Sequence, residues 1–192
     1  QMHLVFLYLK RKRNEVQVKT PTINQNALPF VTVQLPVYNE IYVVERLIDC
    51  IAKFDYPKDR FEIQLLDDSD DETTTLIQNK VSFYAQQGID VQLIRRPERT
   101  GYKAGALKYG LEIAKGEFVA IFDSDFLPHT DFLKKTIPHL VSSPELGVVQ
   151  TRWEHINKEY SYLTKLQSFG LDAHFTIEQV GRNSGEHFIN FN

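Results

Sequence analysis

Residues 118–128 read FVAIFDSDFLP, and this stretch decides both the fold and the site. An apolar run at 118–122 predicts a buried strand, and Asp123 and Asp125 follow on alternate residues. In open α/β sheets, ligands bind at the carboxyl ends of the strands. Two hard oxygen ligands there suit Mg²⁺ or Mn²⁺, which would carry a diphosphate. An acidic turn is the alternative interpretation, because Asp and Ser favour turns.

The composition is that of an ordinary globular domain. The chain has 192 residues, of which 42% are hydrophobic and 24% charged, with a formal net charge of −3. This length can bury a substantial core. The lack of a basic excess gives no indication of nucleic-acid binding. Cys50 is the single cysteine, so an internal disulfide is excluded, and its apolar helical surroundings predict a core residue.

Both ends read as parts of a longer protein. Residues 2–9, MHLVFLYL, are shorter than the roughly 20 residues that span a bilayer, but they suit the end of a spanning helix. The basic cluster at 10–13 would place the following domain on the cytoplasmic side of a membrane. Alternatives for residues 1–13 are an amphipathic surface helix or a frayed tail. At the other end, HFINFN (187–192) stops inside an apolar and aromatic run.

Between these ends the chain alternates strands with helices. Residues 14–29 read as a linker, and one domain is expected over 28–192. Strands are expected at 30–35, 62–66, 91–94, 118–122 and 147–151. Helices are expected at 43–54, 72–86, 102–114, 131–141 and 159–180, with Pro36 breaking the first strand and Pro138 bending or ending the fourth helix. This order predicts an α/β fold, a mostly parallel sheet of apolar strands with helices on both faces.

Polar side chains gather where the predicted strands end, and parallel strands share one rim. In chain order they are Tyr38, Asn39 and Glu40; Asp67 and Asp68; Arg95, Arg96 and then Lys103; and Asp123 and Asp125. Carboxylates, a lysine and a helix N-terminus together suit a nucleoside diphosphate with its metal. Asp68 could instead cap the next helix, Asn39 could serve a turn, and Asp70 and Asp71 could be solvated or capping.

The glycines argue against other nucleotide-binding enzymes. Gly101 and Gly105 form G-x-x-x-G, which is not the G-x-G-x-x-G of dinucleotide sites, and no G-x-x-x-x-G-K-[ST] occurs. The first strand is followed by P-V-Y-N-E at 36–40, where a sugar nucleotidyltransferase would carry a glycine-rich loop.

Four motifs in order make the pattern specific. They are P-x-Y-N-E (36–40), L-L-D-D-S-x-D-E-T (65–73), G-Y-K-A-G-A-L (101–107) and A-I-F-D-S-D-F-x-P (120–128). This succession resembles the family-2 inverting glycosyltransferases of the cellulose-synthase-like branch. The likeness is nearest to bacterial relatives of the plant mannan- and glucan-synthase-like enzymes, and it covers about residues 30–192.

The resemblance implies a GT-A (Rossmann-like) fold, a nucleotide-diphosphate sugar and Mg²⁺ or Mn²⁺. By motif, Tyr38 and Glu40, with Pro36 beside them, match positions at the nucleobase and ribose. Asp68 matches the aspartate that contacts the base, and Lys103 the lysine near the diphosphate. Asp123 and Asp125 match the D-x-D that holds the metal and the donor.

Two family motifs are missing. The T-E-D motif, whose aspartate is the general base, would follow Asn192, so the resemblance implies no catalytic base within this chain. Residues 150–153 read Q-x-R-W, one residue short of Q-x-x-R-W, and the family would place them on a strand beside the donor site. Glu178, within the last predicted helix, is not expected to replace the base.

The implied function is transfer of a hexose, with inversion, from a UDP-glucose or GDP-mannose type of donor to a growing polysaccharide or glycan. No residue decides between these donors. The implied protein is anchored by adjacent transmembrane helices, and the fragment alone would be inactive. The alternatives are a non-catalytic nucleotide-sugar-binding domain and a sugar-nucleotide pyrophosphorylase, which the missing glycine-rich loop disfavours.

Overall fold

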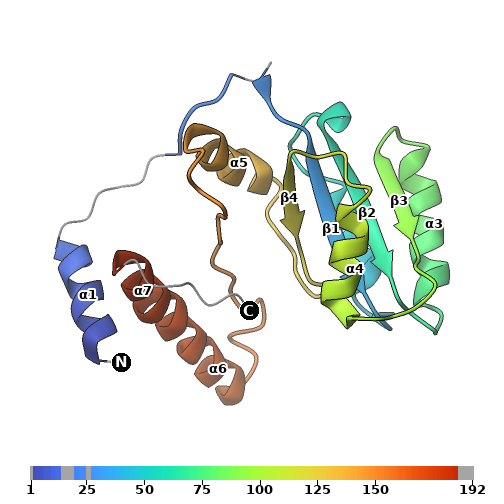
Figure 1. Ribbon diagram of the computed structural model, residues 1–192. Helices are drawn as coiled ribbons and strands as arrows, with labels where there is room; N and C mark the ends of the chain where they lie inside the picture. The colour runs from blue at the N-terminus through green and yellow to red at the C-terminus, as the bar shows by residue number, and fades with distance from the viewer. Residues whose placement is uncertain (1, 14–19, 25–26, 186–192) are drawn as a thin grey trace. The chain divides into compact units, whose positions relative to one another are not determined.

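A computed structural model of the chain describes residues 2–13, 20–24 and 27–185 (Figure 1). The chain divides into two compact units, one of Thr20–Gly147 and one of Gln1–Lys19 with Val148–Asn192. Much of the predicted linker, at 14–19 and 25–26, and all of the run at 187–192 lie outside the described residues. The predicted domain limits stay a prediction.

A four-stranded parallel sheet forms the centre of the Thr20–Gly147 unit, in the order β3-β2-β1-β4. The strands are β1 (Val31–Val37), β2 (Phe61–Asp67), β3 (Asp90–Ile94) and β4 (Phe118–Ile121). β1 pairs with β2 along its whole length, but with β4 only over Val31–Gln34. The prediction of a mostly parallel α/β sheet is confirmed.

β1 continues through Pro36, which was expected to break it. Pro36 lies two residues beyond Gln34, the last β1 residue that pairs with β4. Alternate residues of β1 turn toward β4, as Gln34 O does when it accepts from Phe122 N at 3.2 Å. Pro36 therefore turns its missing N–H to a side where the pairing has already ended, so no ladder hydrogen bond is lost.

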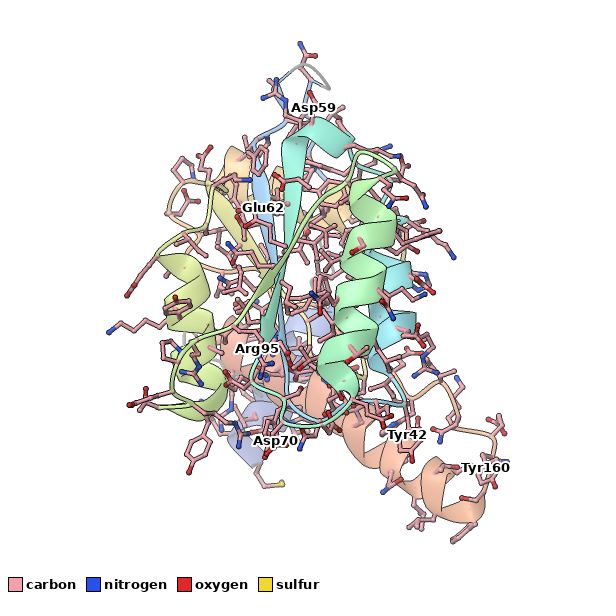
Figure 2. The ribbon with its side chains drawn as sticks, turned by 90° about the vertical axis from the view of Figure 1, so that its right-hand side faces the viewer. Tyr42, Asp59, Glu62, Asp70, Arg95 and Tyr160 are labelled. Atoms are coloured by element: carbon pink, nitrogen blue, oxygen red, sulfur yellow. The ribbon has the colours of Figure 1, made fainter. Side chains whose placement is uncertain are left out.

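Helices cover both faces of the sheet. Figure 2 shows α3 (Thr73–Ala85) on one face and α4 (Tyr102–Leu111) on the other. α2 (Val44–Ile51) lies beside α3, where Lys80 Nζ donates to Asp49 Oδ1 at 2.7 Å. The apolar core packs on the α2 and α3 side and includes the fully buried Val33, Leu35, Leu47, Ile63 and Ile77.

The face beneath α4 is polar, which the expectation of continuous apolar strands missed. Gln34 and Gln64 are buried there, and Gln34 Nε2 donates to Gln64 Oε1 at 3.0 Å. A Cβ at Gly110 of α4 would lie 2.8 Å from Gln34 Nε2 and 2.7 Å from Leu66 Cδ2. Gly110 therefore lets α4 approach the sheet closely.

In the sheet formed by the described residues β4 is an edge strand, and the prediction that it is buried was wrong. Phe118 and Ala120 pack against the core, whereas Val119 and Ile121 are 36% and 49% exposed. The side chains of a strand alternate between two faces, so a uniformly apolar run does not show that both faces are covered.

α5 (Phe132–Ser142) continues through Pro138, so the prediction that it could end there was wrong. Pro138 is buried together with Leu133 and Ile137, and Phe132 stacks on Phe54 with ring centroids 6.2 Å apart. This apolar burial offsets the hydrogen bond that a proline removes from a helix.

The described elements of the unit formed by Gln1–Lys19 and Val148–Asn192 are all helical. It contains α1 (Met2–Arg13), α6 (Tyr162–Ala173), a π-helical turn (His174–Gln179) and α7 (Val180–Ser184). Ser161 and Thr164 form a capping box, which explains why α6 begins three residues after the predicted start at 159. α7 packs on α1, since a Cβ at Gly181 would lie 2.7 Å from Leu4 O.

The strand expected at 147–151 is absent, and with it the strand expected for residues 150–153. Residues 146–155 have no regular structure, and no described strand pairs with them. A short apolar stretch forms a strand only where a neighbour completes its hydrogen bonds.

Among the described helices, none has the length and apolar character needed to cross a bilayer. α1 has 12 residues. Its assignment as the end of a spanning helix stays a prediction.

Candidate functional site

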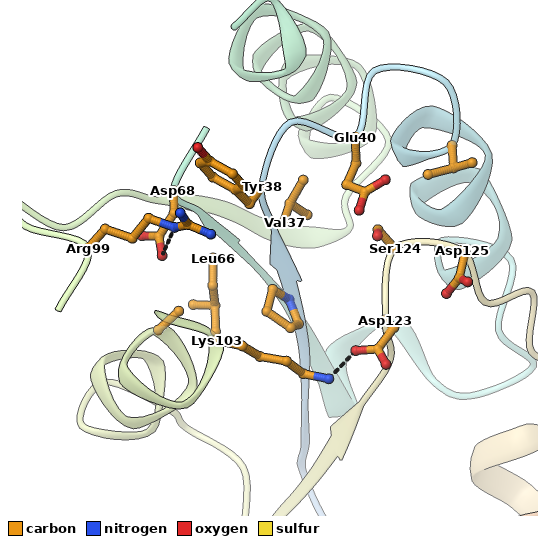
Figure 3. Close-up of a pocket in the computed structure, with 13 residues that line it drawn as sticks. Val37, Tyr38, Glu40, Leu66, Asp68, Arg99, Lys103, Asp123, Ser124 and Asp125 are labelled. Atoms are coloured by element: carbon orange, nitrogen blue, oxygen red, sulfur yellow. Dashed lines mark hydrogen bonds and ion pairs between the residues drawn. The ribbon is translucent and has the colours of Figure 1, made fainter. Parts of the chain in front are cut away.

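A cavity of about 400 Å³ opens at the carboxyl ends of the strands (Figure 3). It lies where the strand order reverses between β1 and β4, the usual ligand position in such sheets. All seven predicted site residues line it: Pro36, Tyr38, Glu40, Asp68, Lys103, Asp123 and Asp125. The structure therefore brings the predicted set together, while the role of each residue in binding stays a prediction.

One wall of the cavity is the D-S-D segment after β4. Lys103, from the first turn of α4, forms an ion pair with Asp123. Both side chains remain partly in water, at 49% exposed for Lys103 and 39% for Asp123. Ser124 is buried and Asp125 is exposed. Figure 3 shows Glu40 pointing into the cavity on the side of Ser124 and Asp125, across from the Tyr38 side.

Asp123 and Asp125 fit a divalent cation that is bound together with a diphosphate. Their oxygens are the hard ligands that Mg²⁺ and Mn²⁺ prefer. Within residues 2–13, 20–24 and 27–185, no group of three His, Cys, Asp or Glu side chains could hold a metal ion. Mg²⁺ is commonly bound by one or two carboxylates plus substrate phosphates, which is the donor set this wall could complete.

The opposite wall stacks an arginine on a tyrosine. The Arg99 guanidinium carbon lies 3.3 Å from the ring centroid of Tyr38 and 5.1 Å from that of Tyr102. Arg99 Nε also lies 3.9 Å from Asp68 Oδ2. Arg99 was not singled out from the sequence, although the aromatic and basic residues around it supply the signal for a cation–π contact.

Asp68 is held by a buried bidentate ion pair. Arg96 Nε donates to Asp68 Oδ1 at 2.8 Å and Arg96 Nη2 to Oδ2 at 2.6 Å, and both side chains are 8% exposed. The hydrogen bonds that Arg96 donates to Asp68 raise the pKa of Arg96 above its usual value. The alternative that Asp68 caps α3 was wrong, because Asp71 Oδ1 accepts from Thr73 N there at 2.9 Å.

The loops after β1 and β2 are clamped together. Asn39 adopts a left-handed backbone with φ of 55°, which Asn tolerates better than most residues. Its Nδ2 donates to Asp70 Oδ1 at 2.7 Å, and its Oδ1 accepts from Asp70 N at 3.1 Å. This clamp fixes Tyr38 and Asp68, which flank it, relative to each other.

Asp67, also predicted at the rim, points away from the cavity. It is 1% exposed and accepts from Ser69 N at 3.0 Å and from Thr74 Oγ1 at 2.6 Å. Arg95, which follows β3, donates at 2.6 Å to the O atom of Ser69, which lies in the same loop as Asp68. Asp67 and Arg95 therefore support the loop that carries Asp68.

Cys50 and Glu178, which were also considered in the sequence, do not line the cavity, and their contacts are structural. Cys50 is half-buried, with Sγ 3.0 Å from Pro128 O, and burial raises the pKa of its thiol. Glu178 accepts from His174 and Arg182, and these hydrogen bonds lower its pKa.

The parallel sheet with its pocket at the reversal point is the fold of GT-A glycosyltransferases, as the comparison with solved structures shows. The structure is similar to that of the mannosyltransferase PcManGT from Pyrobaculum calidifontis, solved with GDP-Man and Mn²⁺, with a TM-score of 0.68. That likeness has 30% sequence identity and covers 83% of this chain and 45% of that one. Residues 32–191 match the model described as glycosyl transferase family 2, and the chain belongs to this family.

Plant enzymes are similar in sequence. Glucomannan 4-beta-mannosyltransferase 1 of Cyamopsis tetragonoloba is 41% identical over an alignment of 197 positions, which covers 98% of this chain and 38% of that protein. Probable glucomannan 4-beta-mannosyltransferase 4 of Oryza sativa subsp. japonica is 44% identical over 170 residues, which cover 86% of this chain and 31% of that protein. The chain thus spans 38% and 31% of the lengths of these relatives. The predicted family and branch are confirmed, and a bacterial origin stays a prediction.

Proposed function

We propose that this chain is the donor-binding part of a metal-dependent, inverting mannosyltransferase that uses GDP-mannose and extends a glycan. The observation that carries the proposal is the single cavity shared by Tyr38, Lys103, Asp123 and Asp125 at the reversal point of the sheet. Mannose is preferred to glucose because the two plant relatives are named mannosyltransferases and PcManGT was solved with GDP-Man.

Each wall of the cavity has a separate task in this proposal. The Tyr38 ring lies beside the nucleobase, and Asp68, fixed by Arg96, is aimed at the polar edge of the base. The Lys103 ammonium donates to the phosphates and neutralises charge as the nucleoside diphosphate departs. A divalent cation held by Asp123 and Asp125 would withdraw charge from the same leaving group.

Inversion requires an acceptor hydroxyl that attacks the anomeric carbon opposite the leaving diphosphate, and a base that takes its proton. The family resemblance assigns this base to an aspartate that would follow Asn192. On this proposal the chain binds the donor and does not turn it over.

Calorimetry with GDP, UDP and GDP-mannose tests the proposal, with Mn²⁺ or with a chelator present. GDP should bind more tightly than UDP, and removing the metal should weaken both. Asp125→Ala should weaken GDP·Mn²⁺ binding at least about tenfold, or ~1.4 kcal/mol, with an unchanged circular dichroism spectrum.

The matched control is Asp59→Ala, because Asp59 is 82% exposed and precedes β2, at the far end of that strand from the cavity (Figure 2). The affinity of the Asp59→Ala protein for GDP should equal that of the unchanged protein. If Asp125→Ala also binds GDP·Mn²⁺ as tightly as the unchanged protein, the assignment of Asp125 as a metal ligand is wrong. Tighter binding of UDP than of GDP would remove the mannose donor.

A further inference from the structure

We infer that Lys103 is an exchangeable counter-ion. It pairs with Asp123 until a diphosphate binds and becomes the new partner of Lys103. Asp123 is then available to the cation, so cation and nucleotide bind jointly. The inference deepens the proposed function, because it relies on a diphosphate ligand at the same cavity. It assigns to Lys103 a part in the order of binding, beyond contact with phosphate.

The first step is that the Asp123 carboxylate is already neutralised. Lys103 forms an ion pair with Asp123 across the cavity (Figure 3). A divalent cation that binds Asp123 alone must displace this ammonium or tolerate it as a near neighbour of like charge. The pair therefore lowers the affinity of the cavity for a cation without a nucleotide.

The second step is that the protein offers a cation few other ligands. Asp125 is the second carboxylate of this wall, and Glu40 also lines the cavity, but no three such side chains among the described residues are arranged to hold a metal ion. Diphosphate oxygens would complete the coordination, as is common for Mg²⁺ sites that keep only one or two carboxylates. The same oxygens give Lys103 a doubly charged alternative to Asp123.

The third step is that Lys103 can exchange partners without movement of α4. Arg96 holds the start of the helix, donating to Thr100 O in the segment just before it at 2.5 Å and to the O of its first residue, Tyr102, at 2.9 Å. A Cβ at Gly105 would lie 2.0 Å from Thr100 O, so the first turn packs tightly on that segment. The lysine head, on a flexible four-carbon stem, is the part free to rotate.

The strength of the pair suits an exchange. Ion pairs in which both side chains are partly in water contribute up to ~1 kcal/mol, which corresponds to about fivefold in affinity. A ligand with two negative charges can overcome this, and a buried pair would resist it. By thermodynamic linkage, the nucleotide should tighten cation binding by the same factor by which the cation tightens nucleotide binding.

Electron paramagnetic resonance of Mn²⁺ tests the inference, because free aquated Mn²⁺ gives a signal that disappears on binding. We expect Lys103→Gln to bind Mn²⁺ alone about threefold to fivefold more tightly than the unchanged protein. Lys108→Gln is the matched control, since Lys108 is an exposed lysine on the same helix, and its Mn²⁺ affinity should not change. Added GDP should tighten Mn²⁺ binding less in Lys103→Gln than in the unchanged protein.

Mn²⁺ affinity in Lys103→Gln that is equal to or weaker than that of the unchanged protein would overturn the inference, and so would an equal gain in Lys108→Gln. The same holds if neither the unchanged protein nor Lys103→Gln binds Mn²⁺ alone. These outcomes need no nucleotide, so they are separate from failure of the proposed function, which would appear as absent GDP binding with Mn²⁺ present.

Discussion

The two ends of the sheet both pair a lysine with a carboxylate, but they differ in burial. At the amino end Glu62 is 1% exposed and accepts from Thr32 Oγ1 and from Lys115 N, each at 2.7 Å. Lys115 Nζ lies 3.3 Å from the other oxygen of Glu62. At the carboxyl end, Lys103 and Asp123 are both partly in water.

The difference shows how similar groups can serve opposite purposes. Glu62 has fixed partners, including a backbone N–H, and Gly116 N donates to Thr32 Oγ1 at 2.8 Å to complete the cluster. A buried carboxylate whose partners are fixed is costly to disturb. The exposed pair at the other end can be separated at little cost and is free to respond to a ligand.

The largest expected effect comes from removing the buried carboxylate. Glu62→Ala leaves Thr32 Oγ1 and Lys115 N without their acceptor, and should lower the free energy of unfolding by about 3 kcal/mol in urea denaturation. Glu117→Ala is the control, because Glu117 is exposed two residues after Lys115, and it should change stability by less than ~0.5 kcal/mol. Similar free energies of unfolding for the two variants would contradict the claim that the buried carboxylate at the amino end of the sheet stabilises the fold.

A smaller effect is expected from the lysine at the amino end. Lys115→Met should cost about 1 kcal/mol at pH 7, because half of this side chain is in water and Lys115 N still donates to Glu62. The hydrogen bond to Asp90 raises the pKa of Lys115, burial opposes it, and the hydrogen bond to Glu62 adds to the rise.

The sign of this pKa shift sets the pH dependence. A lysine whose pKa is raised in the folded state stabilises the fold fully below its unfolded pKa of about 10.4, and loses this effect as pH rises through the folded value. The stability difference between the unchanged protein and Lys115→Met should therefore be constant from pH 7 to about 10 and shrink above that. A difference that grows above pH 10 would contradict this account.

The smallest effect on stability belongs to the carboxyl end. Asp123→Asn should change the free energy of unfolding by less than ~0.5 kcal/mol, since it removes only a partly exposed ion pair. Thermal denaturation of this variant and of Lys103→Gln measures the effect. A loss above ~1 kcal/mol in both would mean that the exposed pair holds the fold as the buried cluster does.

The sequence predicted the sheet and the shared rim because both depend on local patterns. Apolar runs such as that before Asp67 end at polar residues, and parallel strands bring these ends to one edge. That rule was enough to collect Tyr38, Lys103 and Asp123 at one cavity.

Partners that lie far apart in the chain could not be predicted in this way. Thr32 and Glu62 are polar residues within predicted strands, and only the folded structure shows that they are buried and hydrogen-bonded to Lys115 and Gly116. Three arginines lie between β3 and α4, and the backbone path decides that Arg96 reaches Asp68 while Arg99 covers Tyr38. The π-helical turn at His174–Gln179 has no sequence signal that separates it from an ordinary helix.

The cluster around Glu62 also depends on how much of the chain has been synthesised. It joins Thr32, Asp90 and Gly116 from successive segments, so it can close only when the chain has been made through Gly116. Asp123 and Asp125 emerge from the ribosome just afterwards. Every residue of this cluster is thus synthesised before β4 and before the carboxylates of the D-S-D segment that line the cavity.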